Sequence, residues 1–182
     1  MAIEFARFFG FDVIAIDRGT AKGKLCLDQG ASHFFDVALL STEEVVTSIL
    51  KMSFKEGHHG VEGVIVASGG SIGPFHMAFE ILRPLGVIMI LGNPNPENYM
   101  KLDVPKMLIK NIKIVSTLMG GRKDCEEALA YLAAGIIHPR LDIRSLVDIN
   151  QILEEIESGQ TLGKVVISIP QDQEPGICDK II

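Results

Sequence analysis

The sequence predicts an α/β fold in which helices cover both faces of a parallel sheet. Segments with the apolar periodicity of helices alternate along the chain with short apolar runs, which is the order that builds such a sheet. The runs are rich in Val and Ile and carry few polar residues, as expected of strands buried on both faces. With 182 residues, 47% of them hydrophobic, the chain is large and apolar enough for one core.

The first half of the chain contains three expected helices, the first two each followed directly by a strand. Gly10 and Gly30 follow helical stripes at the positions where a C-terminal cap belongs. Ser41, with Glu44 three residues later, forms a capping box that opens the third helix. The helices are expected over residues 1–10, 21–29 and 41–54, and the strands over residues 11–17, 33–37 and 63–67.

The second half continues the same alternation of helices and strands. Its expected strands are again short runs of branched apolar residues, and we find neither an internal repeat nor a linker that separates two domains. The helices are expected over residues 72–82, 100–109, 123–134 and 149–157, and the strands over residues 86–91, 112–116 and 165–169. Residues 171–180 are polar and are expected to fray.

The charge distribution excludes some classes of partner. The chain carries 17 basic and 23 acidic residues, a net charge of -6, and its basic residues are scattered rather than clustered. This pattern argues against nucleic acid and against an anionic membrane surface. No apolar run reaches the roughly 18 residues that cross a bilayer, and the N-terminus lacks the order of a signal peptide. We therefore expect a soluble, cytoplasmic protein.

Cysteine and histidine spacing does not indicate a metal site. Cys26, Cys125 and Cys178 are odd in number and widely spaced, so we expect three free thiols. Catalytic zinc needs three convergent ligands and an open position, and no such set can be assembled from these cysteines and the five histidines. His58 and His59 are adjacent, whereas two ligands on one helix face lie about four residues apart. We expect no bound zinc and name no catalytic residue.

Asp17 closes the first apolar strand and is the most informative polar residue. A carboxylate at the carboxyl end of a parallel strand can accept both hydroxyls of an adenosine ribose, and it repels the extra phosphate of NADP. Arg18 could weaken this discrimination against NADP. The alternative is an ordinary turn aspartate that pairs with Arg18 or caps the next helix, and the sequence leaves both interpretations open.

A series of motifs then matches one family in order and spacing over most of the chain. The motifs include A-R-F-F-G-F-D-V-I-A-I-D at residues 6–17, R-P-L-G at 83–86, G-G-R-K-D at 120–124 and G-K-V-V at 163–166. Together they resemble the cofactor-binding domain of the zinc-type medium-chain alcohol dehydrogenases, especially the microbial and fungal branch. The resemblance implies a Rossmann-like fold and NAD-dependent hydride transfer with a small alcohol or carbonyl substrate. NADP is not excluded, and zinc is implied in full-length relatives only.

The same resemblance assigns cofactor contacts to residues that follow strands or begin helices. The positions that it implies are Asp17, Lys22, Ser68, Leu91, Gly92, Met119 and Lys164. Each also has a structural interpretation. Lys22 and Lys164 could be surface lysines, and Ser68 and Gly92 could belong to plain turns. For Arg122, near Met119, we prefer a loop that leads into a helix capped by Asp124.

The chain also departs from the family pattern. It resembles that domain only from about the middle of the first helix, so the first strand, the glycine loop and the catalytic domain have no counterpart. We therefore expect residues 1–170 to form an incomplete dinucleotide-binding domain and residues 171–182 to form a polar tail. Without the glycine loop several hydrogen bonds to the pyrophosphate are lost, at about 1.5 to 3 kcal/mol each. We accordingly expect NAD binding weaker than millimolar and impaired or absent activity for this chain alone.

Two further expectations follow from the missing strand. The strands that flank its position should either close against each other or leave apolar edges exposed. The alternative to an enzyme is a non-catalytic truncated homologue that pairs with another subunit. The sheet edge at residues 165–169 would then form a homo- or hetero-oligomer contact.

Overall fold

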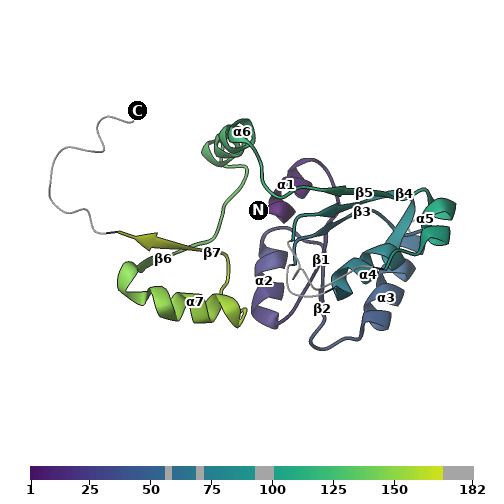
Figure 1. The fold of residues 1–182 in the computed structure, drawn as a ribbon, viewed down its shortest axis with the longest axis horizontal. Helices are drawn as coiled ribbons and strands as arrows, with labels where there is room; N and C mark the ends of the chain where they lie inside the picture. The colour runs from purple at the N-terminus through teal and green to yellow at the C-terminus, as the bar shows by residue number, and fades with distance from the viewer. Residues whose placement is uncertain (56–58, 69–71, 93–100, 170–182) are drawn as a thin grey trace.

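A computed structural model describes residues 1–55, 59–68, 72–92 and 101–169. Within these residues the chain alternates helices and strands, and every strand pair is parallel. Figure 1 shows β1 to β5 and most of the helices at one end of the molecule, and β6, β7 and α7 at the other end. The predicted α/β class is confirmed.

The N-terminal part follows the prediction closely. Gly10 and Gly30 have φ values of +85° and +100°, which suit the glycines that end helices. The capping box is formed, since Ser41 N and Oγ each donate to Glu44 Oε2 at 2.8 Å. The elements are α1 (Ala2–Phe8), β1 (Ile14–Asp17), α2 (Thr20–Asp28), β2 (His33–Asp36) and α3 (Thr42–Lys55).

The central part forms a sheet with the strand order β3-β4-β5. Two predicted boundaries are wrong here. β4 begins at Leu82 rather than residue 86 because Leu82 already pairs with Val61, and a register shift follows before Gly63. The helix expected from residue 100 begins at Val104. The elements are β3 (Val61–Val66), α4 (Gly73–Ile81), β4 (Leu82–Ile90), α5 (Val104–Lys110) and β5 (Lys113–Ser116).

Local chemistry explains the later start of α5. The Asp103 carboxylate accepts a hydrogen bond from Lys106 N at 3.0 Å, which makes Asp103 the N-cap. Pro105 lies in the first turn, where its missing N–H costs no helical hydrogen bond. The helix ends at Asn111, which adopts a left-handed conformation with φ of +49°.

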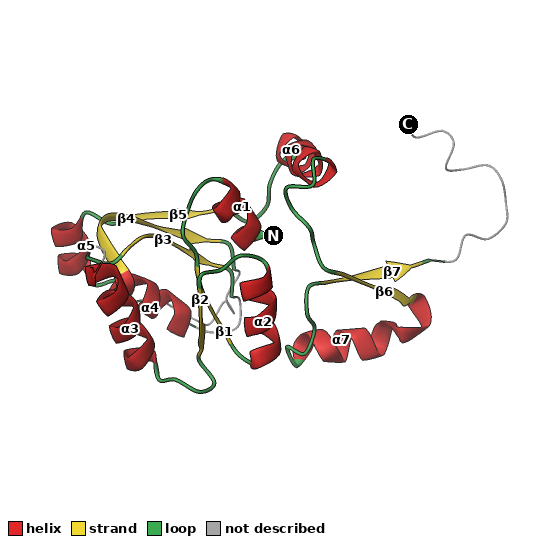
Figure 2. Ribbon diagram, turned by 180° about the vertical axis from the view of Figure 1, so that it is seen from behind, coloured by secondary structure: helices red, strands yellow, loops and turns green. Residues whose placement is uncertain are grey.

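The C-terminal part contains a strand that the sequence analysis missed. Residues Leu141–Ser145 (β6) pair in parallel with Lys164–Ser168 (β7), and α7 (Ile149–Glu157) connects them after a short 3-10 helix, Leu146–Asp148. The alternation of L-D-I-R-S could have revealed β6. Figure 2 shows this unit well separated from β1 to β5, with α6 (Arg122–Ala133) between them.

Two buried clusters form the core beside the central sheet. One cluster joins β3 and β4 to α4, and its members include Val66, Phe79, Leu82 and Ile88. The other cluster lies between α3 and α4; its buried members are Val45, Ile49, Met77 and Ile81. On the N-terminal side, Phe5 of α1 contacts Tyr131 of α6 edge-on, with ring centroids 5.4 Å apart. No helix in the described part of the chain is long and apolar enough to cross a membrane.

The strands do not form one continuous sheet. β1 pairs only with β2, and β3 pairs only with β4, so no strand–strand pairing joins the two groups within the described residues. Of the two outcomes expected for a missing strand, the edges stay open rather than closing against each other. Even so, Ile14 and Ile16 of β1 pack on the same cluster as Val61 and Val64 of β3.

Candidate functional site

Asp17 and Lys22 come together at the carboxyl end of β1. Asp17 Oδ1 accepts a hydrogen bond from the backbone N–H of Arg18 at 2.7 Å and lies 3.4 Å from Lys22 Nζ. The two side chains remain 49% and 30% exposed, so a ligand can reach both. The predicted pairing with Arg18 therefore involves the backbone of that residue, while Lys22 is the cationic partner. This open ion pair is the best candidate site that the structure offers.

Asp36 supports this site and was not singled out from the sequence. Its Oδ1 accepts hydrogen bonds from Gly19 N at 3.0 Å and from Ala38 N at 2.9 Å. Gly19, with φ of +92°, precedes α2, so Asp36 at the end of β2 holds the turn that leads from Asp17 to Lys22. The signal was available, because Asp36 closes an apolar strand just as Asp17 does.

Gly92 lies where the ends of β3 and β4 approach each other. The Val66 carbonyl accepts hydrogen bonds from Leu91 N at 2.9 Å and Gly92 N at 3.0 Å. A Cβ at position 92 would collide with the backbone carbonyl of Ser68. The close contact explains the glycine structurally, and it also brings Ser68 and Gly92 together at one rim of the sheet, as the resemblance implies. Residues 69–71 and 93–100, which follow Ser68 and Gly92 in the chain, lie outside the described part.

Met119 follows β5 at the same rim of the central sheet. Its side chain is 79% exposed, and the Thr117 hydroxyl donates to its carbonyl at 3.1 Å. Nearby, Gly121 is the N-cap of α6, and its backbone N–H donates to Asp124 Oδ2 at 2.6 Å. Asp124 therefore supports the start of the helix from its third position rather than as the cap itself. Arg122 begins that helix.

Lys164 is not brought together with the other predicted residues. It begins β7, and its backbone N–H donates to the Arg140 carbonyl at 2.9 Å. β7 pairs with β6 and belongs to the separate C-terminal unit (Figure 1), whereas the other predicted residues lie at the ends of β1, β3, β4 and β5 or on α2.

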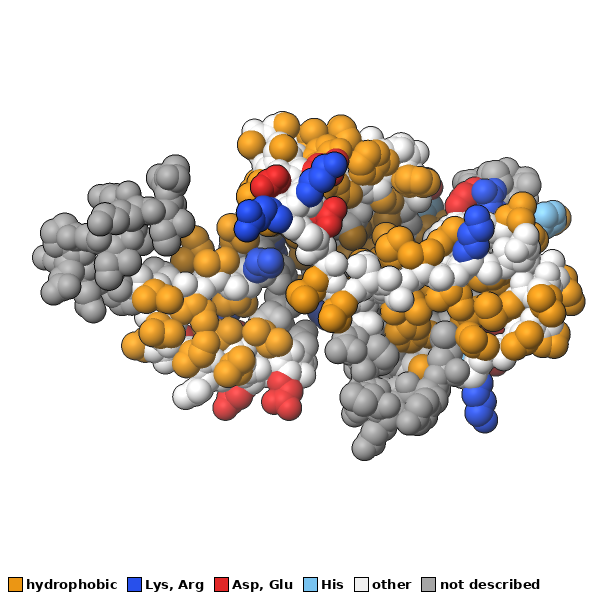
Figure 3. Space-filling model, turned by 45° about the horizontal axis from the view of Figure 1, so that its top comes forward, with side chains coloured by type: hydrophobic (Ala, Val, Ile, Leu, Met, Phe, Trp, Pro, Cys, Tyr) orange, Lys and Arg blue, Asp and Glu red, His pale blue; other side chains and the backbone are white. Residues whose placement is uncertain are grey.

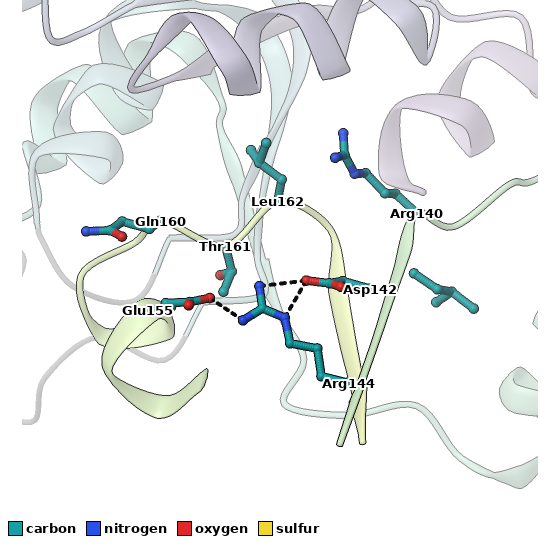
Figure 4. Close-up of a pocket in the computed structure, with 8 residues that line it drawn as sticks. Arg140, Asp142, Arg144, Glu155, Gln160, Thr161 and Leu162 are labelled. Atoms are coloured by element: carbon teal, nitrogen blue, oxygen red, sulfur yellow. Dashed lines mark hydrogen bonds and ion pairs between the residues drawn. The ribbon is translucent and has the colours of Figure 1, made fainter. Parts of the chain in front are cut away.

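A polar cavity of about 310 Å³ lies in the C-terminal unit and contains none of the predicted cofactor contacts (Figure 4). The side chain of Arg144 lies between those of Asp142 and Glu155 in the lining of this cavity. Arg144 Nε donates a hydrogen bond to Asp142 Oδ2 at 2.8 Å. Arg144 Nη1 lies 2.8 Å from Glu155 Oε2 in an ion pair. The hydrogen bond from Arg144, and then one from Gln151, holds the pKa of the Glu155 carboxyl below its usual range. Asp142 of β6 and Glu155 of α7 both bind Arg144, so we interpret this cluster as a structural link between α7 and β6.

The cysteines and histidines of the described part show no metal-binding arrangement. No group of three His, Cys, Asp or Glu residues in that part could hold a metal ion. Cys26 and Cys125 are free thiols, whereas Cys178 and His58 lie outside the described residues. Burial, and then the nearby Asp17 charge, raises the pKa of the Cys26 thiol, which disfavours the thiolate that binds metals.

Comparison with known proteins gives consistent matches. A sequence profile described as "Zinc-binding dehydrogenase" matches residues 1–134. An alcohol dehydrogenase of Geobacillus stearothermophilus is 26% identical over 174 residues, which cover 94% of this chain and 48% of that protein. Among solved structures, the alcohol dehydrogenase of Aeropyrum pernix superimposes with a TM-score of 0.81 at 23% identity and covers 93% of this chain.

A benzyl alcohol dehydrogenase from Acinetobacter calcoaceticus superimposes equally well, with a TM-score of 0.80 at 22% identity. The matches to solved structures cover 93% of this chain but only 46% of each of these two proteins. The chain therefore spans about half the length of the relatives that it matches. At these identities the solved structures show a shared fold.

Proposed function

Because this chain belongs to the zinc-binding dehydrogenase family, we propose that it is a nucleotide-binding part of an alcohol dehydrogenase-like oxidoreductase. The observation that carries this proposal is the exposed Asp17–Lys22 pair at the carboxyl end of β1. In dinucleotide-binding folds, an acid at this place holds the adenosine ribose.

The geometry of Asp17 suits a ribose. Its Oδ1 is engaged by Arg18 N and Lys22, and no hydrogen bond within the described residues reaches Oδ2. That oxygen can accept a ribose hydroxyl, while Asp36 keeps the following turn in place. The negative charge opposes a 2′-phosphate, and Lys22 partly offsets it, so we propose NAD as the preferred nucleotide. When bound, NAD would supply the hydride acceptor for a small alcohol.

The described residues do not fit the zinc that the family name implies. They offer no group of three ligands, so the proposal assigns no metal ligand to them and derives no step through zinc. The residues of this chain are proposed to bind and orient the nucleotide. We propose that residues outside the described site determine which substrate is used.

Nucleotide binding followed by NMR tests the ribose assignment. For the unaltered chain we expect a dissociation constant for NAD weaker than about 1 mM, the equivalent of about -4 kcal/mol. Replacing Asp17 by Asn removes a charged acceptor and should weaken NAD binding by roughly tenfold. It should also reduce the preference for NAD over NADP. The matched control is Asp28→Asn, which changes an exposed acid at the end of α2 and should leave the affinity unchanged.

Two results would contradict different parts of this proposal. A clear micromolar titration of the unaltered chain would contradict the expected weak affinity, although it would support nucleotide binding. Equal affinities for the Asp17→Asn and Asp28→Asn variants would show that Asp17 does not hold the ribose.

A second candidate function, pairing with another subunit, is favoured by the exposed strand β7. β7 pairs only with β6 in the described part, and Val166 and Ile169 are 37% and 70% exposed. Figure 3 shows hydrophobic side chains over much of the visible face of this unit. Such an edge can add a strand from another chain.

Size-exclusion chromatography with the Geobacillus stearothermophilus relative tests the pairing. We expect co-elution of the two chains, and we expect Val166→Lys to abolish it because the new charge would lie in the contact. Val147→Lys is the control, since Val147 is 86% exposed and lies outside the strand. Separate elution of the unaltered chains would exclude this candidate.

A further inference from the structure

We propose that Asp36, at the end of β2, is a second determinant of nucleotide choice, which acts with Asp17 to exclude the 2′-phosphate of NADP from the turn before α2. The inference rests on the proposed function, because it takes the adenosine ribose to lie at Asp17. It goes further by assigning part of the discrimination to a residue on another strand. Two backbone amides and a balance of charges carry it.

Strand pairing places the two carboxylates side by side. β1 and β2 run parallel, and their register pairs Asp17 with Asp36. Neighbouring strands lie about 4.8 Å apart. The Asp17 carbonyl also accepts from Val37 N at 3.0 Å, which fixes the two strand ends relative to each other. The Asp36 charge therefore lies within the Debye length of about 8 Å from a group bound at Asp17.

The same two carboxylates occupy the backbone amides of the turn. Asp17 Oδ1 accepts from Arg18 N at 2.7 Å, and Asp36 Oδ1 accepts from Gly19 N at 3.0 Å. Successive amides ahead of a helix are the donors that bind phosphate groups in many proteins. A 2′-phosphate would have to displace these two hydrogen bonds before it could use the amides. A ribose hydroxyl does not, since it donates to a carboxylate oxygen.

The charges around the turn would favour an anion if the two acids were absent. Arg18 and Lys22 are cationic, and α2 has no acid in its first turn and no side-chain cap at Gly19. The N-terminal end of a helix also carries a partial positive charge. Asp17 and Asp36 balance the two cations. Removal of either acid leaves an excess of positive charge, so nucleotide choice depends on both.

The Asp36 charge is held in place and has no cationic partner. Its Oδ1 accepts from Gly19 N and from Ala38 N at 2.9 Å, so two backbone donors orient this half-buried side chain. Within the described residues, Asp36 forms no ion pair with a lysine or arginine. Asp17, in contrast, lies 3.4 Å from Lys22 Nζ. Asp36 therefore supplies the negative charge that Lys22 does not directly offset.

The ratio of the NAD and NADP dissociation constants, measured by NMR, tests the inference. Asp36→Asn keeps an oxygen that can accept from Gly19 N and Ala38 N but removes the charge. We expect the preference for NAD over NADP to fall by about threefold to tenfold, while the affinity for NAD changes by less than about twofold. A purely structural role would weaken both nucleotides alike and leave the ratio unchanged. The double variant Asp17→Asn/Asp36→Asn should prefer NADP.

Three further variants provide the controls. Asp36→Glu keeps the charge and should keep the preference for NAD. Asp28→Asn removes the same charge at the other end of the nine-residue helix α2, about 12 Å along its axis, and should leave the ratio unchanged. If Asp36→Asn does not fold, Asp36→Ser replaces it, because a serine hydroxyl can also accept from a backbone amide.

Adenosine 2′-monophosphate separates failure of this inference from failure of the proposed function. It carries the phosphate without a pyrophosphate, so it tests the exclusion even where NAD does not bind. The double variant should bind it at least about tenfold more tightly than the unaltered chain. Equal binding, or an unchanged nucleotide ratio for Asp36→Asn, would overturn the inference. This gain without any NAD binding by the unaltered chain would overturn the proposed function and leave the exclusion by Asp36 standing.

Discussion

Replacing Leu82 by alanine is expected to lower the free energy of unfolding by about 2 to 5 kcal/mol. Leu82 is 0% exposed and belongs to the cluster that joins α4 to β3 and β4. The substitution removes buried methyl groups and leaves a cavity that the surrounding side chains fill only in part. Chemical denaturation followed by circular dichroism measures the change, with the slope checked for two-state behaviour.

The control for this substitution is Leu108→Ala. Leu108 lies on α5 and is 77% exposed, so the same change of side chain should alter stability by no more than about 0.5 kcal/mol. Equal midpoints for the two variants would mean that the α4 cluster does not form the core.

Alanine at Gly60 is expected to destabilise the chain by about 2 to 6 kcal/mol, combining backbone strain with a steric collision. Gly60 has φ of +124°, and a Cβ there would strike the Ile81 carbonyl and lie 2.7 Å from Arg83 N. The buried Ser53 hydroxyl fixes this backbone, since it accepts from Gly60 N at 2.7 Å and donates to Gly60 O at 3.0 Å. The peptide therefore has little freedom to move away.

Gly135→Ala separates strain from collision. Gly135 also has a positive φ, +67°, but a Cβ there would meet nothing within 4 Å. Only the left-handed strain of about 1 to 2 kcal/mol should appear in its thermal denaturation. If Gly60→Ala cost no more than Gly135→Ala, the close approach of Gly60 to the start of β4 would not restrict the chain.

The parts of the fold that were predicted from sequence depend on local chemistry. The box of Ser41 and Glu44 and the glycines that end α1 and α2 act within a few residues, so they can be recognised without tertiary contacts. The early start of β4 depends instead on Leu82 pairing with Val61, a contact between distant parts of the chain. β6 was missed for a different reason, because its alternating pattern was visible but was not interpreted as a strand.

The candidate site divides in the same way. Asp17 and Lys22 are five residues apart, and one turn suffices to bring them together. The contribution of Asp36 depends on β2 pairing beside β1, which the sequence does not state directly. The contact between Ser68 and Gly92 likewise requires the pairing of β3 with β4. Lys164 lies on β7, in a sheet separate from those of the other predicted residues, so its contact with the cofactor stays a prediction.

The separate unit of β6, β7 and α7 has a consequence for how this chain unfolds. These elements contact chiefly one another, and the ion pairs of Arg144 close the unit internally. Regions with few contacts to the rest of a protein can open as cooperative units of their own, at a lower free energy than global unfolding. A single melting temperature would therefore average two different processes, and native-state exchange would resolve the C-terminal unit as a foldon distinct from the α4 cluster.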